Sequence, residues 1–73
     1  MIDYNKWADE YLSNALETKR LIEEYRTKKK NTKSNQLRVY YDRKILILYE
    51  MYSDLIYSSR ELRKKADRIR KRG

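Results

Sequence analysis

Glu50 and Asp54 are the two side chains of this sequence whose types and spacing best suit metal-binding or acid–base chemistry. They stand four residues apart among apolar neighbours, so a helix would present both carboxylates on one side. Such a pair could hold a divalent cation or transfer a proton. Two adjacent carboxylates also repel each other, and a basic residue relieves that repulsion. We therefore expect an arginine, such as Arg43 of a second copy, to face them rather than a metal ion.

Other catalytic chemistry needs residue types that the sequence lacks. Its 73 residues include no His and no Cys, and its one Gly is Gly73. Nucleophile–base triads and most transition-metal sites use His or Cys, and phosphate-cradling loops need glycines. The composition thus predicts a protein that is not an enzyme, with no catalytic residue, no metal site and no cofactor.

The basic residues offer a different chemistry, the binding of anions. The formal net charge of +8 is the sum of −3 over residues 1–25, +7 over 26–44, −2 over 45–59 and +6 over 60–73. Lys and Arg can neutralise the phosphates of a nucleic-acid backbone, an attraction that weakens steeply with salt. The candidate nucleic-acid- or anion-binding residues are Lys28, Lys29, Lys30, Lys33, Arg38, Arg60, Arg63, Lys64, Lys65, Arg68, Arg70, Lys71 and Arg72.

Other partners would suit the same charges. An acidic protein surface could meet them, or they could do no more than keep an apolar rod in solution. An anionic membrane fits less well, because residues 63–72 contain only Ala66 and Ile69 as apolar side chains. Aromatic side chains could stack on bases, but most fall on apolar stripes, where a core role is expected.

Helices must position these residues. The sequence has no Pro, and its eight Tyr and one Trp argue against a disordered chain. Apolar positions near the N-terminus recur at three- and four-residue steps, which predicts a helix with one buried face. These positions are Tyr4, Trp7, Ala8, Tyr11, Ala15, Thr18, Ile22 and Tyr25. Asp3 is the expected N-cap of this helix.

The helical period fails in the polar run that ends at Asn35 and resumes from Gln36. Short polar side chains can turn the backbone there, and Ser34 or Asn35 can cap the helix that follows. We predict an all-α fold in which residues 1–73 form a single domain, an antiparallel helical hairpin whose second helix is the longer. Its parts are a helix over about 4–28, a loop over about 29–35, a helix over about 36–70 and a basic C-terminal tail.

The second helix carries more apolar surface than one neighbour can cover. Its main stripe comprises Leu37, Tyr40, Tyr41, Leu48, Met51, Tyr52, Leu55, Leu62, Ala66 and Ile69. Further apolar residues lie about 80 to 120° round the helix from that stripe. A chain of this size rarely gains more than about 3 to 5 kcal/mol from one core. The candidate protein-interface residues are Leu12, Leu16, Ile45, Tyr49, Tyr52 and Ile56.

We therefore expect a homodimer, in which two hairpins form a four-helix bundle with coiled-coil packing. The alternative is a monomer whose tyrosines tolerate partial exposure, because their polar tips can reach water.

No segment predicts export or a membrane span. Residues 1–15 carry three acidic side chains and no unbroken apolar core, unlike a signal peptide. The longest mostly apolar run, residues 45–57, is far shorter than the roughly 20 residues that cross a bilayer. We expect a cytoplasmic protein.

The composition, rich in Lys, Asn and Tyr, looks like that of an accessory gene product of a low-GC bacterium, phage or mobile element. The run Trp7–Leu12, followed by a second helix with Ser59–Arg63, resembles the N-terminal hairpins of phage transcriptional regulators. The helix-turn-helix of those regulators is missing here, so we transfer neither residues nor activity from them. The resemblance implies only a regulatory role.

Two functions remain. The first is a small dimeric regulatory module that contacts nucleic acid, or a nucleoprotein complex, through its basic ends. The second is a phage- or mobile-element-type inhibitor or adaptor that docks an apolar helix face on a specific host protein. Substitution of Ile45, Tyr49 or Ile56 should abolish the second function, whereas charge changes should affect the first.

Overall fold

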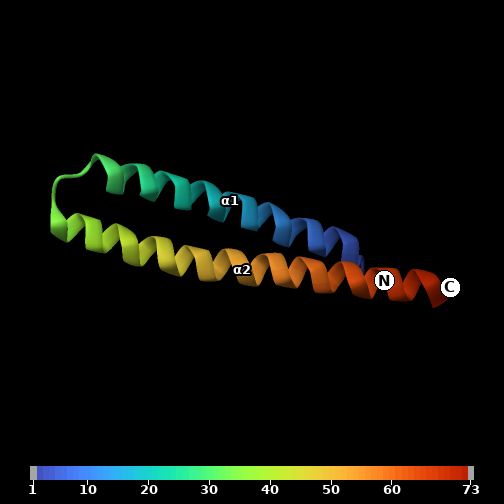
Figure 1. Cartoon of the computed structure of the whole chain (residues 1–73). Coiled ribbons are helices and arrows are strands. Elements are labelled where there is room, and N and C mark those ends of the chain that lie inside the picture. Colours follow the sequence, from blue (N-terminus) through green and yellow to red (C-terminus); the bar gives the residue numbers. More distant parts are fainter. Residues whose placement is uncertain (1, 73) are drawn as a thin grey trace.

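The structure, a computed structural model, is a hairpin of two helices and describes residues 2–72, with the backbone alone for Arg72. Helix α1 (Tyr4–Asn31) and the longer helix α2 (Asn35–Arg72) run antiparallel and are joined by a short loop (Figure 1). The hairpin is a rod of 59 × 15 × 14 Å. The predicted all-α hairpin with a longer second helix is confirmed. Within the described residues, neither helix has an apolar stretch long enough to cross a bilayer.

Helix α1 begins at the predicted cap and ends later than predicted. The backbone N–H of Lys6 donates to the Asp3 carboxylate at 3.0 Å, so Asp3 is the N-cap. The helix continues through Lys28-Lys29-Lys30 to Asn31 instead of ending near residue 28. Lysine is a good helix former, and its charge interacts favourably with the carbonyl end of the helix dipole.

Ser34 caps helix α2. Its hydroxyl accepts a hydrogen bond from the backbone N–H of Leu37 at 3.3 Å, and its carbonyl accepts from Arg38 N–H at 3.0 Å. The Ser34 N–H donates to the hydroxyl of Thr32 at 3.2 Å. These bonds satisfy the loop and the start of α2 while no described residue adopts a positive φ, which explains how the turn forms without glycine.

The shorter loop sets the register between the helices. A loop over residues 29–35 would place Ile22 beside Tyr40 or Tyr41. In the structure the ring of Tyr41 packs instead on Tyr25, with the ring centroids 5.9 Å apart. The observed pairing therefore differs by about one helical turn from the one that a loop over residues 29–35 would give.

Both helices contact each other along a seven-residue repeat. On α1 the fully buried residues Ala8, Ala15 and Ile22 are seven residues apart, and Thr18 is buried between them. On α2 the facing positions are buried or half-buried at alternating steps of four and three residues. They are Tyr41, Ile45, Leu48, Tyr52, Leu55, Ser59, Leu62 and Ala66. This repeat is typical of coiled-coil packing, and the alanines let the two backbones approach closely.

The core that this repeat builds is small. Its buried apolar residues are Ala8, Ala15 and Ile22, and its buried polar residues are Thr18 and Ser59. The Ser59 hydroxyl donates to the carbonyl of Ala8 at 3.0 Å across the helix pair. Thr18 donates to the Asn14 carbonyl at 2.8 Å. The polar groups are satisfied, but three apolar side chains provide little hydrophobic stabilisation for two long helices.

Four residues of α2 lie on a different side from the one that the sequence suggested. Ile45, expected at an outer interface, belongs to the line that packs on α1 and is half-buried. Tyr52, expected both on the inner stripe and at an interface, is half-buried on the same line. Leu37, Tyr40 and Met51, expected on the inner stripe, are exposed to 44%, 48% and 48%. The seven-residue repeat explains the exchange, because it follows 3.5 rather than 3.6 residues per turn and drifts away from a straight helical wheel.

Candidate interaction surfaces

The loop joins the two helices at the closed end of the hairpin (Figure 1). Folding brings eight basic residues to this end, and we call them the hinge cluster. Its members are Arg26, Lys28, Lys29, Lys30, Lys33, Arg38, Arg43 and Lys44. The one acidic residue of this segment is Asp42, whose carboxylate lies 2.6 Å from the Lys29 ammonium. A second carboxylate, that of Glu23, lies 3.1 Å from the Arg26 guanidinium. The other six basic side chains form no ion pair among the described residues, so this end of the rod stays strongly positive.

The other contacts of the hinge cluster hold side chains in place without cancelling most of their charge. Arg38 Nε donates to the carbonyl of Thr32 at 3.3 Å. The ammonium groups of Lys28 and Lys44 lie over tyrosine rings, 5.3 Å and 5.6 Å from the ring centroids. Lys30 and Lys33 are exposed and form no ion pair within residues 2–72. These cations are free to meet an anion from solution.

Three members of the hinge cluster, Arg26, Arg43 and Lys44, were not among the candidates from sequence. They were missed because each lies within a helix, away from the polar run that marked the turn. A hairpin brings residues that precede its loop and residues that follow it to the same end of the molecule. Arg26 lies a few residues before the loop, and Arg43 and Lys44 lie a few residues after it, so counting residues from the loop could have identified them.

The C-terminal cluster lies at the opposite end of the rod and is partly neutralised. Its described side chains are Arg60, Arg63, Lys64, Lys65, Arg68, Arg70 and Lys71, and the candidate side chain of Arg72 lies outside the described residues. Ion pairs join Arg63 to Asp9 at 2.5 Å, Lys64 to Glu61 at 3.3 Å and Arg70 to Asp67 at 3.9 Å. Because the two basic clusters lie at opposite ends of the rod, they do not meet within one copy of the chain.

The Glu50–Asp54 pair lies on the open surface of α2. With Tyr49 and Ser53 it lines a shallow hollow of about 400 Å³. Neither carboxylate takes part in an ion pair among the described residues, and no group of three potential ligands for a metal ion occurs there. The expected arginine partner would have to come from a second copy.

The aromatic residues divide between the helix interface and the surface. Trp7 stacks on Tyr4 and Tyr11, with centroids 6.5 Å and 6.1 Å apart. On α2, Tyr57 is 66% exposed and Tyr49 is 39% exposed. Exposed rings of this kind can join either a protein interface or a stacked base.

One side of the hairpin carries an apolar strip that we call the Leu46 flank. Its apolar residues are Leu12 and Leu16 of α1 and Val39, Leu46, Tyr49 and Ile56 of α2. On each helix these residues recur at three- and four-residue steps, and charged residues occupy other positions of the same line. Some of these charged residues contact the other helix. Arg63 contacts Asp9 near one end of the flank, and Arg26 contacts Tyr49 near the other. Those two contacts place the α1 and α2 parts of the flank on the same side.

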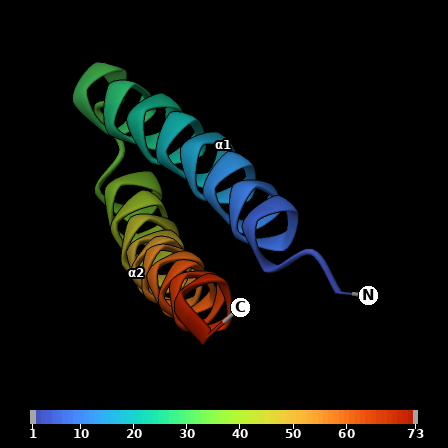
Figure 2. The ribbon, with the colours of Figure 1, turned by 90° about the vertical axis from the view of Figure 1, so that its right-hand side faces the viewer.

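The opposite side carries a second strip, the Ile47 flank. Its apolar residues are Trp7 and Leu21 of α1 and Leu37, Tyr40, Ile47 and Met51 of α2. The α1 line along this side also holds Glu10, Glu17 and Glu24, seven residues apart. Figure 2 looks onto the end of the rod where the termini lie and shows two helices side by side, with no third element covering either side.

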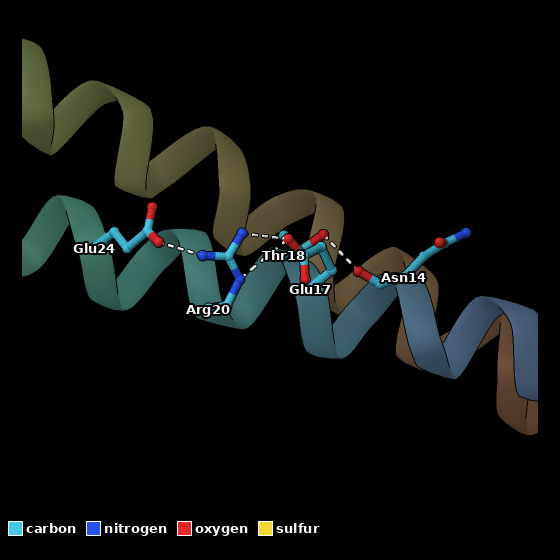
Figure 3. A network of polar contacts seen from close by, with 5 residues as sticks. All are labelled: Asn14, Glu17, Thr18, Arg20 and Glu24. Atoms are coloured by element: carbon cyan, nitrogen blue, oxygen red, sulfur yellow. Dashed lines mark hydrogen bonds and ion pairs between the residues drawn. The ribbon is translucent and has the colours of Figure 1, made fainter.

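A polar network lies on the outer face of α1 (Figure 3). Arg20 reaches Glu17 in one direction and Glu24 in the other, and its Nε lies 3.1 Å from the Glu17 carboxylate. The hydrogen bond from Arg20, and then its positive charge, lower the pKa of Glu17 below its ordinary value of 4.5. Hydrogen bonding to Glu17 and the charges of both carboxylates raise the pKa of Arg20.

The lowered pKa of Glu17 predicts a small pH dependence of stability. A carboxylate with a depressed folded pKa stabilises the fold above its unfolded pKa, and this contribution is lost as the pH falls through the folded pKa. We expect Glu17→Gln to lower the free energy of unfolding slightly at pH 7 and to leave it unchanged at a pH below the folded pKa. Urea unfolding of both proteins at the two pH values measures this. An equal difference at both pH values would contradict it.

Comparison with protein-family models, curated proteins and solved structures gives no match to this chain. Its function is therefore argued from its own residues and their arrangement.

Proposed function

We propose that the chain is a small non-catalytic regulatory module of the cytoplasm that dimerises and contacts the phosphate backbone of nucleic acid through its basic ends. The observation that carries the proposal is the hinge cluster, in which eight basic residues share the closed end of the rod. Among the described residues only two of them form ion pairs, Lys29 with Asp42 and Arg26 with Glu23. A concentrated patch of this kind releases counterions when it meets a polyanion, and that release favours binding.

The form of the hinge cluster suits a phosphate backbone rather than a base-reading contact. Its residues lie at the end of α1, in the loop and at the start of α2, and Lys30 and Lys33 are exposed. Backbone contacts position a protein on nucleic acid but do not specify a sequence. We therefore expect binding with little sequence preference.

Dimerisation into a four-helix bundle belongs to the same proposal. It is supported by the small core within one hairpin and by the large apolar side chains outside it, among them Leu46 at 61% and Ile47 at 52% exposed. Exposed apolar surface on this scale favours association.

Salt-dependent binding tests the proposal. Fluorescence anisotropy of labelled single-stranded and duplex DNA and RNA would give dissociation constants over a series of NaCl concentrations. We expect a straight plot of log K against log salt concentration, with a slope of about −0.9 per duplex phosphate neutralised and about −0.7 per single-strand phosphate. No binding at low salt, or a slope near zero, would contradict the proposal.

A second function is favoured by the exposed apolar residues of α2. The chain could be a phage- or mobile-element-type inhibitor or adaptor that lays α2 against a specific host protein, with its charges secondary. Pull-down of such a partner would survive nuclease and high salt, and Tyr49→Glu would abolish it while changes in the hinge cluster would not.

A further inference from the structure

We infer that a second copy of this chain covers the Leu46 flank, with the two α2 helices antiparallel and Asp42 of each copy opposite Arg60 of the other. The inference rests on the dimerisation that the proposed function includes and names the face through which it occurs; the joining of the basic clusters is its consequence for nucleic-acid binding. The interface itself is argued from the flank alone.

The α2 part of the Leu46 flank is a second helical seam. Alternating steps of three and four residues lead from Val39 through the flank to Arg63. Its members in order are Val39, Asp42, Leu46, Tyr49, Ser53, Ile56, Arg60 and Arg63. The steps match those of the seam that already packs on α1, so this line has the spacing that a helix needs to pack on a further helix.

The part of this line from Asp42 to Arg60 is complementary to its own reverse, and the ends of the line bring Val39 opposite Arg63. When two copies run antiparallel about a point between Tyr49 and Ser53, Leu46 of one meets Ile56 of the other. Tyr49 then covers the small Ser53. Asp42, whose carboxylate also lies 2.6 Å from the Lys29 ammonium of its own chain, meets Arg60. Each of these contacts occurs twice, because a two-fold axis relates the copies.

Charge favours this register over the next one, seven residues away. In that alternative Asp42 would face the uncharged Ser53, and Arg60 would face Asn35 beside the hinge cluster. Both registers bring Arg60 near the hinge cluster, but only the inferred one places a carboxylate, that of Asp42, opposite it. Charge pairing of this kind contributes little to affinity but selects register.

Charge also favours the Leu46 flank over the Ile47 flank. The α1 line beside the Ile47 flank holds Glu10, Glu17 and Glu24, of which Arg20 pairs with the last two, and it ends at Lys28. This line keeps a net negative charge, so two antiparallel copies on that side would bring two acidic lines together. The α1 line of the Leu46 flank instead mixes both signs, with Asp9 and Glu23 beside Lys19 and Arg26.

The inferred interface completes the anion-binding surface. With the copies antiparallel, the C-terminal cluster of one lies beside the hinge cluster of the other at each end of the bundle. Two clusters that a single rod holds apart thereby join into one surface. A bound polyanion would contact both copies and screen their repulsion, so nucleic acid should strengthen the dimer.

Two adjacent residues provide a matched test of the interface. Leu46 and Ile47 are exposed to 61% and 52% and lie on opposite flanks. Sedimentation equilibrium of the full chain without nucleic acid should show a dimer. We expect Leu46→Glu to raise its dissociation constant by about a hundredfold and Ile47→Glu to change it little. Circular dichroism would check that both variants keep the helical hairpin. A monomeric wild type, or equal effects of the two variants, would overturn the inference.

A charge exchange tests the register. Arg60→Asp should weaken the dimer, because it places two carboxylates opposite each other, and Asp42→Arg combined with Arg60→Asp should restore it. An Arg60→Asp variant that dimerises as tightly as the wild type would overturn the Asp42–Arg60 pairing. Since these measurements contain no nucleic acid, failure of the interface is separate from failure of nucleic-acid binding.

Discussion

Ile22→Ala is expected to lower the free energy of unfolding by about 2 to 5 kcal/mol, the usual cost of emptying a buried aliphatic site. Ile22 is 1% exposed and is the largest fully buried side chain among the described residues. Its companions on the same line, Ala8 and Ala15, are too small to take over its contacts. Because a short chain has only a few kcal/mol of stability in total, we expect this change to remove most of it.

Urea unfolding followed by circular dichroism measures this effect, and Ile47→Ala is the matched control. Ile47 undergoes the same change of side chain but is 52% exposed and lies outside both the core and the inferred interface. We expect it to shift the unfolding midpoint only slightly. Similar shifts for the two variants would show that the seven-residue repeat of α1 does not form the core.

Removing two hinge charges is expected to weaken nucleic-acid binding far more than removing two charges elsewhere. In the variant Lys30→Gln with Lys33→Gln, each lost phosphate contact should make the slope of log K against log salt shallower by about 0.9 with duplex DNA. The affinity at low salt should fall on the order of tenfold or more.

The control for this prediction is Lys6→Gln with Lys19→Gln, which lowers the net charge equally but changes residues in the segment of net charge −3. We expect this control to bind almost as tightly as the wild type, with nearly the same salt slope. Equal losses in both variants would indicate that total charge, rather than the hinge cluster, governs binding. Binding isotherms with one labelled duplex at several NaCl concentrations measure all three proteins.

The hairpin could be predicted from sequence because its signals are local. The three- and four-residue spacing of apolar residues over 4–25 predicts α1, and the Asp3 carboxylate indicates where it begins. The polar run before Asn35 indicates the turn. The register could not be predicted in the same way. It depends on whether Lys28-Lys29-Lys30 ends a helix or continues it, and charge repulsion and helix propensity act in opposite directions there.

The inner face of α2 was harder to predict than its existence. A straight helical wheel assigned Tyr40 and Met51 to the core and left Ile45 outside. A seven-residue pattern departs from the straight wheel by about 20° for every seven residues. Over a long helix this angle accumulates until residues predicted on the inner face lie outside it and their neighbours lie on it. The same error explains why only some expected interface residues, such as Leu16 and Tyr49, lie on the outer flank.

The candidate anion-binding residues were predicted in part, because charge runs are visible in sequence. Their division into a concentrated hinge cluster and a partly neutralised C-terminal cluster was not visible. It depends on pairs such as Asp9 with Arg63, which are 54 residues apart in the chain and meet only when the hairpin closes.

The single loop at residues 32–34 also determines the order in which the hairpin can close. The contact between Tyr25 and Tyr41 closes a short segment of chain, whereas that between Ala8 and Ser59 closes one of 51 residues. A contact that closes a short segment loses less chain entropy and forms sooner. Contacts between the helices should therefore form first beside the loop and last near the termini, and should break in the reverse order. In hydrogen exchange the backbone amides at the open end, where the termini lie, should therefore lose protection first. The amides at the loop end, which carries the hinge cluster, should stay protected longest.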